Sequence, residues 1–137
     1  MLALMRREGE RFHAEASASL EQSRGDDALR SLIGACVRQQ LLRPTLAHLL
    51  DIEEGRPELR AEASGAPVLH AVLMQILGRP DLPRQPRLDV VAFDLLAMVR
   101  GMTDAAGERQ ETDVACLQRR VEAAVFGYLR AVAPDTA

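Results

Sequence analysis

The chain has 137 residues, of which 47% are apolar and 3% aromatic, so its length and composition suit one domain with a sizeable core. Its 17 basic and 20 acidic residues give a net charge of −3 without a basic run, which makes the chain a poor binder of nucleic acid. Its apolar runs are far shorter than the ~20 residues that cross a bilayer, and the N-terminus lacks a secretory apolar segment. We therefore expect a single domain over residues 1–137, located in the cytoplasm and making no contact with a membrane.

Two features of the composition indicate the source of the chain and the redox state of its compartment. Lysine is absent and alanine is abundant, which suggests GC-rich coding and a bacterial origin. Cys36 and Cys116 lie eighty residues apart, a spacing that fits no metal site, and an apolar-rich chain of this size needs no disulfide. A reducing compartment is therefore expected.

The apolar period is helical along the first half of the chain, and no alternating run typical of a strand is present. The first predicted helix covers residues 1–22 and ends at "SRGDD". The second begins at Asp26 or Asp27, either of which can cap it, and ends before Pro44. A third, short helix begins at Pro44, where a missing N–H costs nothing, and ends at "EEGRP".

The second half of the chain predicts three further helical stretches. Pro57 can start a helix, but "SGAP" at residues 64–67 should break or kink it, so residues 67–77 form its firm part. The proline-rich "GRPDLPRQP" then predicts an irregular loop. Two long helices follow, over residues 86–107 and 113–132. The fold class is therefore all-α, a bundle of about five to six helices.

Each of the last two predicted helices has two apolar faces when its residues are placed 100° apart. One face is the expected core stripe. The second, smaller face comprises Val90, Phe93, Ala97 and Gly101 on the first helix and Cys116, Ala123, Phe126 and Gly127 on the other. Small residues let another helix approach closely, so this face predicts a homodimer through a four-helix bundle. The alternative is that both helices are central in a monomer and are covered by the remaining helices.

The order of these helices and the pattern of apolar residues along them resemble the C-terminal regulatory domain of the tetracycline-repressor (TetR) family of transcriptional regulators. "LALMRREGERF" resembles the long helix after the family's DNA-binding unit, and "LRSLIGACVRQQLLRPTLAHLL" resembles the next pair, with its Arg-Pro step. "LLAMVRGMTDAAGER" and "LQRRVEAAVFGYL" look like the last two helices, which carry the family's dimer interface. The likeness covers nearly the whole chain.

One part of the family pattern has no counterpart in this sequence. Nothing matches the three-helix, helix-turn-helix module that binds DNA, and the chain begins where that module would end. The resemblance therefore predicts a fragment of a longer protein or a numbering that starts at the first ordered residue. DNA would be bound only through that missing N-terminal unit.

The resemblance also implies a small-molecule effector that binds between helices and changes the spacing of the DNA-binding units. A mostly apolar pocket with a few polar groups is expected, and the effector itself should be mainly apolar. Gln40 and His70 are the polar candidates, because each interrupts or flanks an apolar stripe. The other candidate ligand-binding residues are Leu73, Leu95, Val99 and Met102. The alternatives are ordinary core for the apolar residues, a backbone hydrogen bond for Gln40 and a solvent-facing helix edge for His70.

Few residues suggest catalysis. His48 and Asp51 are three apart on a predicted helix and could share a metal, but no third ligand lies nearby. Asp94 and Asp104 are expected to be solvated or paired with Arg100. No phosphate-binding loop or nucleophile motif is present, so we expect no metal site, no cofactor and no enzymatic activity.

Three functions of different classes remain open at this point. The first is the effector-sensing and dimerisation domain of a TetR-type regulator. The second is a helical protein interaction module without a small-molecule pocket, whose second apolar faces dock a different protein. The third is a small helical enzyme or carrier whose site the sequence does not reveal.

Overall fold

The computed structural model describes residues 2–42 and 66–134, and within these ranges the chain is helical with no strand. The elements are α1 (Leu2–Ala18), the short 3-10 helix η1 (Ser19–Glu21), α2 (Gly25–Leu42), α5 (Ala66–Leu77), α6 (Leu88–Glu108) and α7 (Val114–Val132). The predicted all-α bundle is confirmed. The predicted short helix from Pro44 and the stretch from Pro57 to residue 65 lie outside the described residues.

The helix bounds follow the local signals of the sequence closely. α5, α6 and α7 begin and end within about two residues of the predicted ranges, which is the usual uncertainty of a helix end. Asp113 caps α7, because its side chain accepts a hydrogen bond of 3.0 Å from the backbone N–H of Cys116. The first predicted helix is divided into α1 and η1, where the Ser19 hydroxyl donates to the Ala16 carbonyl.

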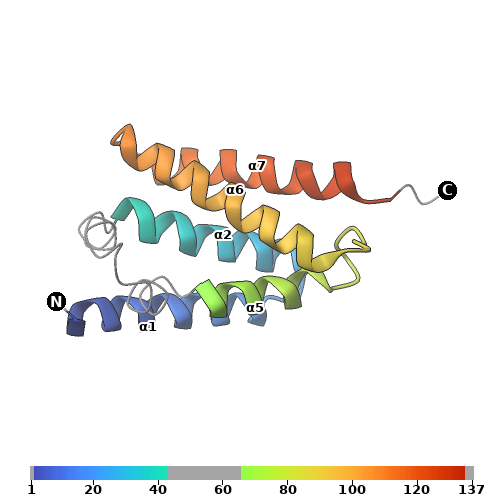
Figure 1. Ribbon diagram of the computed structural model, residues 1–137, viewed down its shortest axis with the longest axis horizontal. Helices are drawn as coiled ribbons and strands as arrows, with labels where there is room; N and C mark the ends of the chain where they lie inside the picture. The colour runs from blue at the N-terminus through green and yellow to red at the C-terminus, as the bar shows by residue number, and fades with distance from the viewer. Residues whose placement is uncertain (1, 43–65, 135–137) are drawn as a thin grey trace.

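The helices are arranged around α2, which lies between α1 and α5 on one side and α6 and α7 on the other (Figure 1). The buried core draws on every described α-helix. Its largest fully buried apolar side chains are Phe12, Leu29, Val37, Ile76, Leu95, Leu117, Val121, Val125 and Leu129. Each such side chain contributes roughly 1.5–3 kcal/mol by leaving water. None of the described helices is long and apolar enough to cross a bilayer.

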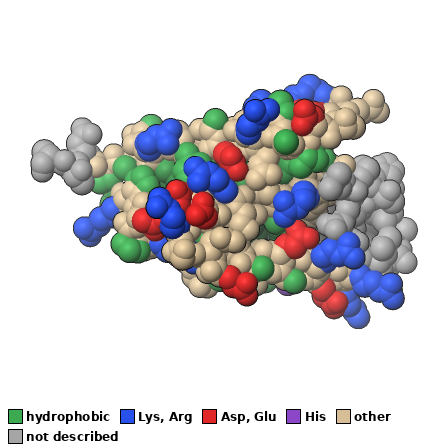
Figure 2. Space-filling model, turned by 180° about the vertical axis from the view of Figure 1, so that it is seen from behind, with side chains coloured by type: hydrophobic (Ala, Val, Ile, Leu, Met, Phe, Trp, Pro, Cys, Tyr) green, Lys and Arg blue, Asp and Glu red, His purple; other side chains and the backbone are tan. Residues whose placement is uncertain are grey.

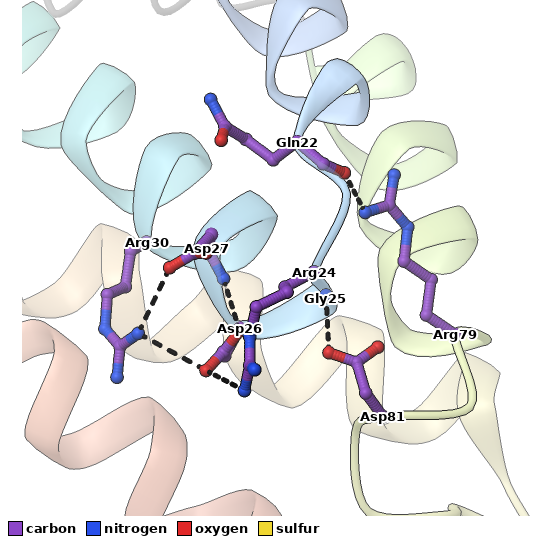
Figure 3. A network of polar contacts seen from close by, with 8 residues as sticks. All are labelled: Gln22, Arg24, Gly25, Asp26, Asp27, Arg30, Arg79 and Asp81. Carbon is purple, nitrogen blue, oxygen red and sulfur yellow. Dashed lines mark hydrogen bonds and ion pairs between the residues drawn. The ribbon is translucent and has the colours of Figure 1, made fainter.

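The start of α2 is held by the loop that follows α5 (Figure 3). The backbone N–H of Gly25 donates to the Asp81 carboxylate over 2.7 Å. Arg79 donates to the carbonyls of Leu20 and Gln22, with 2.6 Å to that of Leu20. These bonds tie the turn between η1 and α2 to the end of α5.

The cap of α2 differs in part from the sequence prediction. The helix begins at Gly25, and Asp26 and Asp27 lie inside its first turn, where both pair with Arg30 over 3.6 Å. The free N–H at the start of the helix is taken by Asp81, fifty-six residues further along the chain. As predicted, the Asp26 carboxylate also accepts a hydrogen bond of 2.9 Å from a backbone N–H of the first turn, that of Asp27, whereas the bond to Asp81 comes from a distant loop and leaves no local sequence signal.

Replacing Gly25 by alanine is expected to destabilise the fold by about 1–3 kcal/mol, because this corner has no room for a side chain. A Cβ at residue 25 would lie 2.9 Å from both the Asp81 Oδ1 and the Leu82 Cγ atoms. Gly78→Ala is the control, since its Cβ would lie 3.5 Å from the nearest atom, the carbonyl oxygen of Met74, which is an ordinary van der Waals contact. Urea unfolding of both variants measures the difference, and equal stabilities would contradict the tight packing at Gly25.

Candidate interaction surface on α6 and α7

The outward side of α6 carries apolar residues that the rest of the described chain does not cover. Phe93 is 64% exposed and Val90 37% exposed, and Ala97 and Gly101 are also exposed. The inward side of the same helix provides the buried residues Val91, Ala92, Leu95, Thr103 and Ala106. Exposed large apolar side chains that gather on one helix face mark an interaction surface more often than isolated ones do.

Two glycines on these helices have open space above them within the part of the chain that the structure describes. A Cβ added to Gly101 or Gly127 would meet no atom within 4 Å. Glycine within a helix costs about 1 kcal/mol relative to alanine, so an interior position with free space gains nothing from it in a monomer. Close approach by another helix would provide a reason for both glycines.

The predicted interface residues on α7 divide into two groups. Ala123 is exposed and Gly127 half-buried, on the side of α7 away from its buried residues. Phe126 instead packs against the core, and the Arg30 guanidinium of α2 lies 4.9 Å from the centre of its ring. Phe126 therefore has a partner in its own chain, which the periodicity of α7 alone does not reveal.

A hydrogen bond joins α6 to α7 at the edge of this surface. The Tyr128 hydroxyl donates to the Asp94 carboxylate, and this bond raises the pKa of Tyr128. From its sequence position Asp94 was expected to be solvated or paired with Arg100. Tyr128 was not predicted as its donor, because Tyr128 belongs to the core stripe of α7. Tyr128 combines the two roles, since its ring packs on the core and its hydroxyl reaches Asp94.

The turn between α6 and α7 is closed by a second polar cluster. Gln110 has a φ of 56°, and the N–H groups of Gln110 and Glu111 bond to the carbonyls of Gly107 and Ala106 in a Schellman arrangement. This turn places the Glu111 carboxylate against Arg120, with two contacts of 2.8 Å. The hydrogen bond from Arg120, supported by one from Arg109, holds the pKa of Glu111 below its usual value of 4.5.

The Cys116 thiol lies in the same cluster, 3.2 Å from an Arg120 nitrogen that donates to it. Cys116 is half-buried, on the helix side that was predicted to form the interface. The other cysteine differs from it, because burial raises the pKa of the Cys36 thiol to about 12. Cys36 is therefore a neutral packing residue at physiological pH.

The candidate ligand-binding residues occupy different environments. Leu73 and Leu95 are fully buried in the core, and Val99 and Met102 are half-buried against it. His70 is half-buried, and its ring lies 4.8 Å from that of Phe93. The side chain of Gln40 lies outside what the structure describes.

His70 has one feature that the sequence could not show. Its Nε2 atom is buried and has no hydrogen-bond partner among the described residues, although His70 lies next to the exposed ring of Phe93. A buried nitrogen without a partner is uncommon, and it is where a bound polar group would be stabilised. The structure thus places His70 and Phe93 together at the junction of α5 and α6.

The charges of the described residues give no sign of a nucleic-acid or metal site. On the face shown in Figure 2, basic and acidic side chains are intermixed. The described residues include no group of three or more His, Cys, Asp or Glu able to hold a metal ion. His48 and Asp51, the pair noted in the sequence, lie outside the described residues.

The chain matches no family model, and comparisons with curated proteins and with solved structures return no match. The resemblance to the TetR family therefore stays a prediction, which rests on the order of the helices and on the pattern of apolar residues on their faces.

The Glu111 cluster predicts acid sensitivity of the α6–α7 turn. Because the folded pKa is below 4.5, ionised Glu111 stabilises the fold above pH 4.5, and this contribution is lost as the pH falls through the lowered folded value. Wild type should therefore melt higher than Glu111→Gln at pH 7, by a few degrees or less for such a surface pair, and the difference should shrink as the pH falls below 4.5 and through the lowered folded pKa. Thermal melts of both proteins at several pH values measure it. In an Arg120→Gln background most of the difference should be absent at every pH, and its persistence there would contradict the assigned cause.

Proposed function

We propose that this chain is the effector-sensing and dimerisation domain of a TetR-type bacterial transcriptional regulator. In this proposal a helix-turn-helix unit outside the chain binds DNA in the cytoplasm, and a mainly apolar effector binds between the helices. The observation that carries the proposal is the exposed apolar face of α6 beside the small residues of α7. The open space above Gly101 of α6 and Gly127 of α7 would let further helices pack closely against this surface.

The charges of the two helices support a second copy of this chain as the occupant of that face. α6 carries four acidic residues and one arginine, a net charge of −3, whereas α7 carries three arginines and one glutamate, a net charge of +2. In a two-fold dimer the same patch meets itself, so α6 of one protomer can lie against α7 of its partner. This pairing brings opposite charges together, and pairing α6 with α6 would oppose like charges.

His70 supports the effector-sensing part of the proposal. Its unpartnered Nε2 atom lies at the α5–α6 junction, close to Phe93, and would gain a partner from a polar group on an apolar molecule. The end of α5 is also connected to the end of α1, since Arg79 donates to the carbonyls of Leu20 and Gln22. A displacement of α5 would therefore reach α1, the helix that in this proposal follows the DNA-binding unit.

The dimer is tested by placing one charge on the α6 face. Ala97→Glu should weaken self-association by about 100-fold or more, because its larger side chain would occupy the space that the partner helix needs and burial of a further charge is costly. Ala14→Glu is the matched control, since Ala14 is an exposed alanine on α1, and it should leave the dimer unchanged. Sedimentation equilibrium of wild type and both variants measures the dissociation constants. A wild type that stays monomeric at tens of micromolar would refute the dimer and favour the interaction module that docks a different protein.

The effector is tested by native mass spectrometry of the purified chain under gentle conditions. We expect a dimer at twice the chain mass, with a co-purified small molecule as additional mass. His70→Leu should lose most of that additional mass while remaining a dimer, because only the polar contact is removed. Met74→Leu, another half-buried position on α5, serves as the control and should retain it. A wild-type dimer that never carries additional mass would contradict the sensing role and leave a dimerisation module.

A further inference from the structure

An apolar stripe on α6 contains one charged residue. Val90, Asp94, Ala97 and Gly101 follow one another at spacings of four, three and four residues, and all four are exposed. This is the spacing with which residues line the seam between packed helices. Between Val90 and Gly101, Asp94 is the single charged position of this seam, and the same spacing leads on to the exposed acidic residues Asp104 and Glu108 at the end of α6.

The carboxylate of Asp94 already has a donor within its own chain. The Tyr128 hydroxyl of α7 donates to it, and the Tyr128 ring is fixed because it packs against the core. Asp94 itself lies on the exposed side of α6, so it is held in place from the neighbouring helix. The pair bridges the two helices that would form the dimer interface.

A charge within an apolar seam matters when the seam becomes covered. Removing a carboxylate from water is unfavourable unless hydrogen bonds or opposite charges compensate. Tyr128 supplies one such bond in every protomer. A partner placed so that its basic α7 faces α6 supplies the opposite charge, whereas a shifted or reversed partner would cover Asp94 with apolar side chains or with another Asp94.

From this geometry we infer that Asp94, held by Tyr128, is the specificity-determining residue of the self-association surface and fixes the register in which a second copy docks. The inference rests on the proposed dimer. The Asp94–Tyr128 pair then determines which dimer forms in preference to other assemblies, and the apolar residues of the stripe provide the affinity. Single polar residues in helical seams act in this way, at a cost in affinity.

The inference is tested with Tyr128→Phe, Asp94→Leu and the double variant. Tyr128→Phe keeps the packed ring but leaves the carboxylate without its donor, so we expect the dimer dissociation constant to rise about 10-fold. Asp94→Leu should bind at least as tightly as wild type but form a mixture that includes higher oligomers. The double variant should resemble Asp94→Leu, because Tyr128 acts only through the carboxylate. Sedimentation equilibrium gives the constants, and native mass spectrometry gives the distribution of oligomers.

Thr103→Val is the matched control. It also removes one hydroxyl from the α6–α7 unit, but Thr103 is buried on the core side of α6, where it donates to the Val99 carbonyl over 2.9 Å. We expect it to lower the stability to urea without changing the dissociation constant or the oligomer distribution. This separates loss of an interface contact from general destabilisation.

The outcomes distinguish this inference from the dimer itself. A wild-type dimer that Tyr128→Phe leaves unchanged, or an Asp94→Leu variant that remains a single dimeric species, overturns the role of the pair and leaves the dimer standing. A wild type that is monomeric throughout the concentration range overturns both.

Discussion

The burial of α2 between two pairs of helices is the constraint on which the rest of the structure depends. Its buried residues spread over most of its circumference and comprise Gly25, Ala28, Leu29, Leu32, Ile33, Gly34, Ala35 and Val37. They contact α1 and α5 on one side and α6 and α7 on the other. Because α2 takes the central position, α6 and α7 lie at the periphery, and each needs only one of its two apolar faces for the core. Their remaining faces are therefore available to a partner.

Polar contacts fix the two ends of this bundle in different ways. At one end, Asp81 and Arg79 hold the start of α2 and the end of η1 against the α5–α6 loop. The close packing there leaves no room for a side chain at residue 25, which is glycine. At the other end, the Schellman turn and the Glu111–Arg120 pair set the angle at which α7 returns along α6. Polar contacts therefore fix both loops that flank α6, and a surface that is ordered before binding loses less entropy when it binds.

The local parts of the structure were predictable, whereas several pairings at the candidate site were not. Residues 67–77 and 113–132 were recognised from apolar periodicity, proline positions and the Asp113 cap, all of which act over a few residues. The ring of Phe126 was grouped with the outward residues of α7, but Arg30 from α2 covers it. Asp94 was expected to be solvated or paired with Arg100; it is exposed, but its hydrogen-bond donor is Tyr128, thirty-four residues further along.

The sequence by itself determined the helical class, the ends of the helices and the presence of two apolar faces on α6 and α7, because these follow from a repeat of 3.6 residues and from proline and glycine chemistry. The periodicity also predicted the core face of α6, since Val91 and Leu95 are buried and Val90 and Phe93 are exposed. Only the tertiary structure decided which distant residues meet, because it brought Tyr128 to Asp94, Arg30 to Phe126 and Asp81 to the start of α2. The physical reason is that burial and long-range hydrogen bonds depend on which helices become neighbours, and periodicity contains no information about neighbours.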